Sequence, residues 1–167
     1  MESDNRKVLL KIDNLKQWFP LKGNKFVKAN DGITIDIYEG ETFGLVGESG
    51  CGKSVTALSI LQLVQSPPGK IVGGEILFEG RNLLELSEQE MQNEIRGNKI
   101  SMIFQDPMTS LNPLIPVGEQ VGEMLWSHDK ALSKADREAR VVDLFRMVRI
   151  PEADKRLKSF PHEFSGG

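Results

Sequence analysis

The sequence predicts an α/β protein, and three observations carry this prediction. Residues 47–54 read G-x-x-x-x-G-K-S, and they stand between an apolar run at 42–46 and a stretch of helical spacing at 55–64. Residues 33–37 alternate between apolar and polar side chains, which is typical of a strand with one buried face. After Val117, apolar residues recur three and four positions apart, as they do in amphipathic helices. We therefore expect a strand–loop–helix unit, a small sheet and a helical region.

Composition limits the class of protein. The chain has 167 residues, of which 39% are hydrophobic and 27% are charged, and this suits a globular domain. The net charge of -3 gives no support to general nucleic-acid binding. The single cysteine, Cys51, excludes an intramolecular disulfide and suits a reducing compartment. No signal peptide is visible, and no apolar run approaches the roughly 18 residues of a membrane span, so we expect any membrane role to come through a partner.

Besides the strand expected at 42–46, three strands and one break are expected before residue 80. Residues 8–12 form an apolar opening strand, which ends at 17–20, and residues 33–37 form a half-buried strand. The prolines and glycine at 65–69 end the first helix, and the β-forming residues at 71–78 follow. We expect the strands that precede the phosphate loop to belong to a small antiparallel sheet.

The later elements are marked by caps and stripes. A turn is expected at 79–82, and a short helix opens at 87–90, where the spacing is that of a capping box. Another short apolar strand is expected at 99–104. A second capping signal at 133–136 opens the second of two helices, which ends at 150–151. The apolar stripes of the two helices, which we expect to be core, are Val117, Val121, Met124 and Leu125, and then Val141, Leu144, Phe145 and Val148.

The residue types in 47–54 suit phosphate binding. The three glycines let the backbone take conformations in which several N–H groups converge on an anion. The following helix adds its positive N-terminal end. Lys53 supplies a charge for the β- and γ-phosphates, and Ser54 supplies a hydroxyl for Mg²⁺. A chance match in a chain with 16 glycines is the alternative, and the flanking strand and helix argue against it.

Two residues, Phe26 and Gln105, each have two possible roles. Phe26, on a loop before the phosphate loop, either stacks on adenine or packs under the small sheet. Gln105 follows a predicted strand and precedes Asp106 and Pro107; it either reaches Mg²⁺ and the attacking water or is a plain turn residue. The only two histidines, His128 and His162, lack ligand spacing, so no zinc site is expected.

The order of these motifs resembles the ATPase subunits of ABC transporters. Residues 47–54 match the phosphate loop, 103–107 match the glutamine loop, and 164–167 match the start of the signature, with a helical insert between the last two. Within that family, residues 105–113 and 160–167 are similar to the oligopeptide/dipeptide permease branch. The resemblance covers the chain from about residue 8 onward.

The resemblance implies a P-loop NTPase core of the ABC ATPase type, with a small antiparallel β subdomain and a helical subdomain insert. The implied division is 1–104 for the β subdomain and phosphate-loop core, and 105–167 for the glutamine loop and helical subdomain. The family's next elements carry a magnesium-linked Asp and a catalytic Glu, and the sequence stops before them. We therefore expect the N-terminal part of an ABC nucleotide-binding domain, truncated before the Walker B strand.

The resemblance also implies ATP and Mg²⁺ as cofactors. It makes Gln105 a catalytic residue that senses Mg²⁺ together with Ser54, and it places the signature residues on the γ-phosphate bound by a partner subunit. Val55 stands where many members have Thr, so one hydroxyl contact is lost and the backbone N–H remains. The implied nucleotide contacts are Phe26, Gly47, Glu48, Ser49, Gly50, Cys51, Gly52, Lys53, Ser54, Val55, Ser165, Gly166 and Gly167.

The implied function is ATP binding and, in the complete protein, ATP hydrolysis that powers an importer of peptide-like solutes. The implied partners are a second ABC ATPase subunit, identical or sister, the transmembrane permease subunits and, indirectly, a solute-binding receptor, with no nucleic acid. The implied location is cytoplasmic, on the inner face of the cell membrane. The alternatives are a non-transport ABC ATPase and a nucleotide-binding fragment without catalysis. The chain of 167 residues alone is expected to be inactive.

Overall fold

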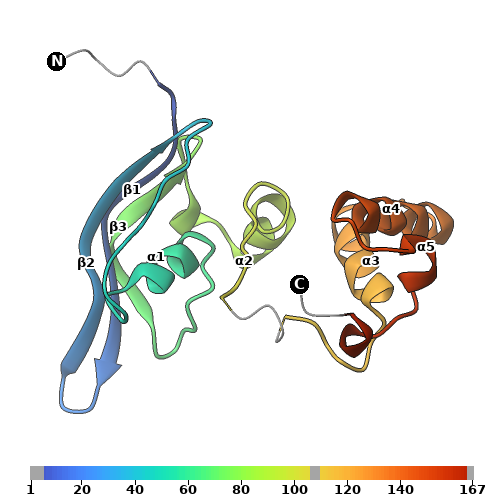
Figure 1. Cartoon of the computed structure of the whole chain (residues 1–167). Helices are drawn as coiled ribbons and strands as arrows, with labels where there is room; N and C mark the ends of the chain where they lie inside the picture. The colour runs from blue at the N-terminus through green and yellow to red at the C-terminus, as the bar shows by residue number, and fades with distance from the viewer. Residues whose placement is uncertain (1–5, 106–109, 165–167) are drawn as a thin grey trace. The chain divides into compact units, whose positions relative to one another are not determined.

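The computed structural model describes residues 6–105 and 110–164, which belong to two compact units, Met1–Arg96 and Gly97–Gly167. The first unit is a twisted sheet with helix α1 against one face, and the second unit is helical (Figure 1). The contacts divide the chain after Arg96, eight residues before the sequence-based boundary at residue 104. The sequence-based division into two subdomains stays a prediction.

The sheet of the first unit is antiparallel throughout, with the strand order β2-β1-β3-β4. Its buried apolar residues include Ile12 and Leu15 of the first strand and Ile76 of the third. This confirms the small antiparallel sheet, although the first two strands are longer than predicted and pair along their whole length. The strands are β1 Val8–Leu21, β2 Lys25–Tyr38, β3 Lys70–Phe78 and β4 Arg81–Asn82.

Helix α1, Lys53–Ile60, follows the phosphate loop and ends four residues before the predicted end at Val64. Gln62 takes a left-handed conformation at φ 52°, which an α-helix does not continue through. Its N–H donates to Ser59 O at 3.1 Å, and Leu63 N donates to Leu58 O at 2.9 Å. These two bonds form a Schellman motif, with Gln62 in the place that glycine usually takes.

A guanidinium satisfies the carbonyls at the end of α1. Arg96 donates to Leu61 O at 2.8 Å and to Gln62 O at 3.1 Å, and it also bonds the carboxylate of Glu88. Glu88 belongs to α2, Glu88–Glu90, which continues as a π-helical turn, Met91–Ile95. The short 3₁₀ helix Leu83–Glu85 comes before it. The predicted capping box at the start of α2 is confirmed, since Glu90 N donates to Ser87 Oγ and Ser87 N donates to Glu90 Oε2.

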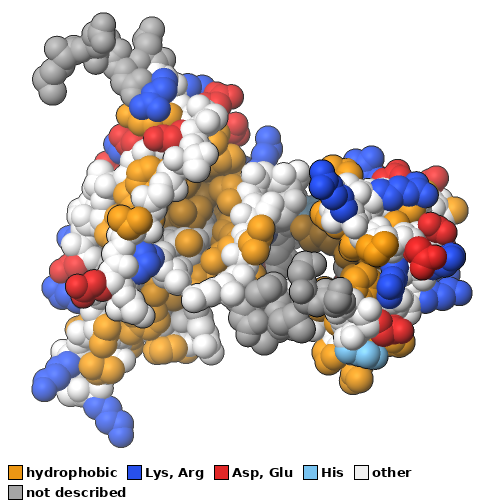
Figure 2. Space-filling view, viewed as in Figure 1, with side chains coloured by type: hydrophobic (Ala, Val, Ile, Leu, Met, Phe, Trp, Pro, Cys, Tyr) orange, Lys and Arg blue, Asp and Glu red, His pale blue; other side chains and the backbone are white. Residues whose placement is uncertain are grey.

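Two predicted strands do not form. Residues 42–46 and 101–104 have no strand conformation, and Ile100 makes only an isolated bridge. Their apolar side chains are open to solvent, since Val46 is 89% exposed and Ile103 is 92% exposed. Figure 2 shows hydrophobic side chains on the visible surface of the first unit. A strand needs a ladder partner for its backbone groups, and no neighbour in the described part of the chain supplies one. The β-forming composition of these segments therefore does not decide their conformation.

The helical unit has its own apolar core. Val117 from the first of its helices packs with Val141, Val142 and Phe145 from the second and with Ala153 from the third. The helices are α3 Val117–His128, α4 Lys134–Met147 and α5 Ala153–Arg156, followed by the 3₁₀ helix Pro161–Glu163. In the part of the chain that the structure describes, no helix is long and apolar enough to cross a membrane.

The predicted stripes of α3 and α4 are confirmed in part. Val117, Val141 and Phe145 are buried, but Met124 is 46% exposed and Val148 is 69% exposed, so their placement in the core was wrong. Met124 belongs to the exposed side of α3, whereas Val148 lies beyond the last helical residue of α4. Both residues match the periodicity, but Met124 lies on the exposed side of α3, and α4 ends before Val148.

Hydrogen bonds define both ends of α4, and its C-terminal end explains the exposure of Val148. Ser133 caps the N-terminus, as predicted, by accepting a hydrogen bond from Asp136 N at 3.1 Å. At the other end, Arg149 takes φ 61°, and Ile150 N donates to Phe145 O at 2.9 Å. Like Gln62 after α1, Arg149 ends a helix in the left-handed region without being glycine. The helix therefore ends before Ile150 and Pro151, where the sequence predicted its end.

Candidate phosphate-binding site

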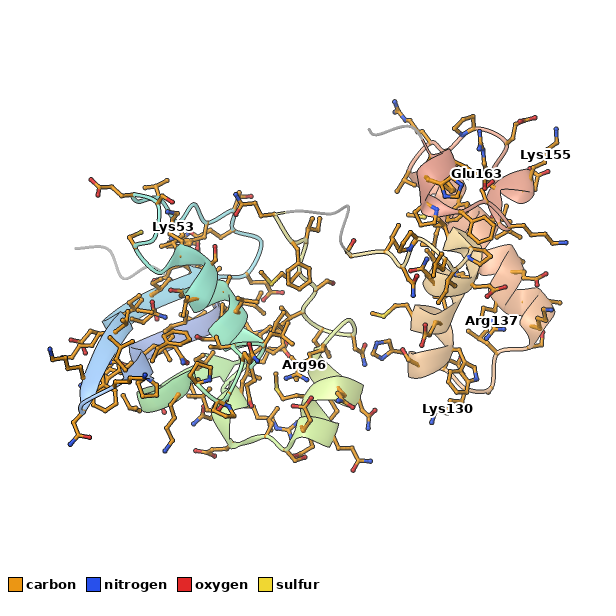
Figure 3. All side chains as sticks on the ribbon, turned by 90° about the horizontal axis from the view of Figure 1, so that it is seen from below. Lys53, Arg96, Lys130, Arg137, Lys155 and Glu163 are labelled. Carbon is orange, nitrogen blue, oxygen red and sulfur yellow. The ribbon has the colours of Figure 1, made fainter. Side chains whose placement is uncertain are left out.

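The loop at 47–54 leads directly into the N-terminus of α1, where Lys53 is the first helical residue (Figure 3). Gly52 is the N-cap, with φ 99°, and its carbonyl accepts the first helical hydrogen bond from Thr56 N at 2.8 Å. The first N–H groups of a helix have no partner within the helix, and together with the helix dipole they attract an anion. The structure therefore gives the loop a donor-rich end.

Strand β2 lies so close to this helix start that a side chain at position 52 has no room. A Cβ atom on Gly52 would stand 2.4 Å from Ala29 O and 2.8 Å from Asn30 Oδ1. On Gly47, a Cβ atom would stand 2.7 Å from Cys51 Sγ. Gly50 has φ 79° and open space around it. Glycine is thus required at position 50 for its backbone conformation alone, and at position 52 for both its conformation and the close packing.

The ammonium of Lys53 lies inside the curve of the loop. Lys53 Nζ donates to Gly47 O at 2.8 Å and to Glu48 O at 2.7 Å, and it stands 3.6 Å from Cys51 Sγ. A turn at 48–51, with Cys51 N donating to Glu48 O at 3.3 Å, holds the loop in this shape. A phosphate oxygen accepts hydrogen bonds as these carbonyls do, so the ammonium is placed to exchange carbonyl partners for phosphate ones.

The other loop residues suit a ligand that arrives from solvent. Glu48, Ser49, Cys51 and Ser54 are exposed, and Val55 is half-buried. Ser54, in the first turn of α1, presents the one side-chain oxygen in the loop that the predictions assign to Mg²⁺. The described residues contain no group of three or more His, Cys, Asp or Glu that could hold a metal ion. The fit to Mg²⁺ therefore rests on Ser54 with the phosphates of a nucleotide as the other ligands.

Phe26 was predicted to lie on a loop, and this prediction is wrong. It lies in strand β2, because the β1–β2 hairpin extends as far as Leu21 and Lys25. Its ring is 5.6 Å from the ring of Trp18 and tilted by 49°, and Phe26 is 50% exposed. The packing partner is thus an aromatic residue of the same hairpin, and part of the ring stays open. Stacking of Phe26 on adenine stays a prediction.

The remaining predicted site residues belong to the second unit. Gln105 is exposed, lies in a bend and does not follow a strand. Asp106 and Pro107 and the signature residues 165–167 lie outside the described residues. The first residue of the signature match, Phe164, makes an edge-on contact with Phe145, with ring centroids 6.2 Å apart. The roles of Gln105 and of the signature stay predictions.

Sequence reasoning missed a polar layer beneath the loop. Gln17 of β1 and Asn30 of β2 are paired in the sheet register, and each is only 1% exposed. Thr56 of α1, also buried, donates a hydrogen bond to Asn30 Oδ1 at 3.2 Å. The signal in the sequence is a polar residue inside each long strand, and it was hidden because the predicted strands stopped short of both positions.

A glycine-rich loop that places a lysine ammonium within its curve, at the N-terminus of a helix packed on a sheet, defines a phosphate-loop nucleotide-binding protein. The family model described as "ABC transporter" matches residues 30–167. The chain belongs to the ABC transporter family.

The sequence is also similar to ATP-binding proteins of peptide transport. The oligopeptide transport ATP-binding protein OppD of Bacillus subtilis is 51% identical over 159 residues, which are 95% of this chain and 44% of the relative. A probable peptide ABC transporter ATP-binding protein, y4tR of Sinorhizobium fredii, is 52% identical over 84% of this chain and 41% of the relative. The chain therefore spans less than half the length of these relatives.

A solved structure supports the fold. The dimeric post-hydrolysis state of the ATP-binding cassette MJ0796, bound to ADP and Pi, superposes with a TM-score of 0.76 at 25% identity. The match covers 93% of this chain and 63% of that one. This similarity confirms the predicted fold class, an ABC ATPase core with an antiparallel β part and a helical part.

Proposed function

We propose that this chain is the ATP-binding part of the ATPase subunit of an ABC importer for peptide-like solutes. The observation that carries the proposal is the ammonium of Lys53, held at 2.7–2.8 Å by two loop carbonyls at the start of α1. That arrangement suits a triphosphate, because backbone N–H groups and one ammonium converge on the same small space. The peptide class is suggested by the relatives at about half identity, which are named as oligopeptide and probable peptide transport proteins.

Each loop residue has a proposed role toward ATP and Mg²⁺. The N–H groups of residues 47–55 hold the phosphates, Lys53 binds the β- and γ-phosphates, and Ser54 binds Mg²⁺. The triphosphate supplies the bond that is broken, and Mg²⁺ neutralises its developing charge. Phe26 supplies an apolar face to adenine, and Gln105 orients water and the metal. The signature residues 165–167 contact the γ-phosphate bound by a second subunit.

The proposed assembly follows from this division of roles. A site whose γ-phosphate contacts come from a second copy or a sister subunit requires a pair of ATPase subunits, and the MJ0796 cassette is described as dimeric. We propose that the pair binds transmembrane permease subunits at the cytoplasmic face of the membrane and acts on solute delivered by a receptor. Binding of ATP closes such a pair, and hydrolysis reopens it.

The first experiment removes the ammonium. Lys53→Ala is expected to weaken ATP binding tenfold or more, which is about 1.4 kcal/mol or more at 25 °C, measured by calorimetry. Lys134→Ala is a matched control, because Lys134 is an exposed lysine whose carboxylate contact with Glu138 is long, at 3.9 Å. Equal affinity of Lys53→Ala and the control for ATP would show that the loop does not bind phosphate.

The second experiment separates binding from turnover. Residues 42–46 and 101–104 are exposed apolar segments without a ladder partner among the described residues. We propose that the polypeptide of 167 residues binds nucleotide and hydrolyses it negligibly, and that a version extended to the length of the relatives releases phosphate. Steady-state phosphate release at matched concentration measures this, and equal rates from both polypeptides would contradict it. Co-purification of the extended version with permease subunits tests the transport assignment.

A further inference from the structure

The start of α1 rests on one buried side chain, Asn30 of strand β2. Asn30 Oδ1 is 2.8 Å from the position that a Cβ atom on Gly52 would take, so the amide lies directly against the last glycine of the loop. The same oxygen accepts a hydrogen bond from Thr56 Oγ1 at 3.2 Å. Asn30 therefore touches the N-cap and the first turn of the helix whose N-terminus is the proposed phosphate site.

The hydroxyl of Thr56 has two acceptors in reach and one hydrogen to donate. Gly52 O lies at 3.0 Å and Asn30 Oδ1 at 3.2 Å. Donation to Gly52 O ties the hydroxyl to its own helix, whereas donation to Asn30 ties the helix to strand β2. Gly52 O also accepts from Thr56 N at 2.8 Å, so Gly52 stays bonded to the helix in either case.

The polar layer of Gln17 and Asn30 lowers the stability of the fold if it serves packing alone. Among the described residues, Asn30 Nδ2 and both amide atoms of Gln17 are buried without a hydrogen-bond partner. A buried polar group without a partner is destabilising, and an apolar side chain of the same shape is tolerated as well or better. A purely structural role thus predicts an apolar residue at position 30.

We propose that Asn30 is a positioning residue for the phosphate loop, which sets the place of Gly52 and of the first turn of α1 through its contacts with Gly52 and Thr56. The inference rests on the proposed binding of ATP at residues 47–54. It assigns to β2 a part in nucleotide affinity that does not involve contact with the nucleotide. Leucine at position 30 has the same branching but bulkier methyl groups, which press on Gly52, and it leaves Thr56 without its acceptor on the strand.

The test compares two amide-to-leucine substitutions in the full-length protein that carries these residues. Asn30→Leu is expected to raise the Kd for ATP about threefold or more, at the lower end of the coupling seen between neighbouring residues, without lowering the melting temperature. Gln17→Leu is the matched control, because Gln17 is the paired buried amide on β1 and faces a cavity of about 440 Å³ lined by Ser59 and Gln62. It is expected to leave the Kd unchanged.

A pair of variants at position 56 keeps the test decisive if Asn30→Leu does not fold. Thr56→Ser keeps the hydroxyl and is expected to bind ATP as the unaltered protein does, whereas Thr56→Val keeps the shape and is expected to weaken binding as Asn30→Leu does. Unchanged affinity in Asn30→Leu or Thr56→Val overturns the inference. So does an equal loss in Gln17→Leu or in Thr56→Ser, since packing alone then explains the effect.

The Lys53→Ala measurement separates this inference from the proposed function. If Lys53→Ala binds ATP normally, the phosphate loop is not the nucleotide site and both fail. If Lys53→Ala loses ATP while Asn30→Leu retains it, only the role of Asn30 is wrong.

Discussion

Gly52→Ala is expected to cost far more stability than Gly50→Ala, although both glycines have positive φ and lie two residues apart. At φ 99° and φ 79°, each alanine meets the left-handed penalty, which is about 1–2 kcal/mol. At position 50 nothing lies within 4 Å of the new Cβ atom, so the penalty ends there. At position 52 the Cβ atom would stand 2.4 Å from a backbone oxygen, Ala29 O, which a side-chain rotation does not relieve.

The displacement at position 52 adds an overpacking cost of about 1–3 kcal/mol, so the total is about 2–5 kcal/mol. In a cooperative unit of 60–100 residues, each kcal/mol lowers the melting temperature by roughly 4–8 °C. Thermal unfolding of the two variants, with and without ATP, measures the difference. Gly52→Ala is also expected to abolish ATP binding, because the helix start moves with Gly52. Equal melting temperatures for the two variants would refute the close approach of β2 to the loop.

Three further predictions concern a thiol, a helix end and a carboxylate. Cys51 is exposed in the loop beside Lys53, so maleimide labelling is expected and MgATP should slow it; equal rates with and without MgATP would count against a nucleotide in the loop. Arg149→Gly should raise stability by about 0.5–1 kcal/mol, because relief of a left-handed penalty of about 1–2 kcal/mol at φ 61° exceeds the extra chain entropy that glycine loses on folding, and a lower unfolding midpoint in urea would contradict the Schellman end of α4. Hydrogen bonds from the hydroxyl and the N–H of Ser87 lower the pKa of Glu90, so its contribution to stability is present above the ordinary carboxylate range and is lost as the pH falls through the lowered pKa. Unfolding measured from neutral to acid pH should show a smaller decline in Glu90→Gln, and identical declines would rule this carboxylate out as a cause.

The parts of the fold that sequence could predict are those whose cause is local. The phosphate loop depends on glycines and a lysine within eight positions, and the caps at Ser87 and Ser133 depend on a side chain three residues from its partner. Helix ends proved harder, because Gln62 and Arg149 take the conformation for which glycine is the usual signal. The energy that holds them there comes from the rest of each unit.

The parts that sequence could not predict depend on distant residues. Residues 42–46 are rich in β-forming side chains, but a strand exists only beside another strand. In the same way, Phe26 was placed on a loop because a hairpin that continues through polar residues has no local sign. The contact between Asn30 and Gly52 joins residues 22 positions apart, and only the packing of α1 on β2 reveals it.

The resting place of the Lys53 ammonium has a consequence for how the empty loop behaves. Because its ammonium donates hydrogen bonds to two loop carbonyls, Lys53 keeps the loop curved without a nucleotide. On the proposed function, ATP enters a loop that needs little ordering, so the entropic penalty of association is small and the ammonium exchanges carbonyl oxygens for phosphate oxygens. For the same reason, a substitution of Lys53 disturbs the unliganded protein as well as the complex. Its effect on affinity therefore combines the loss of a charge with the collapse of a preformed shape.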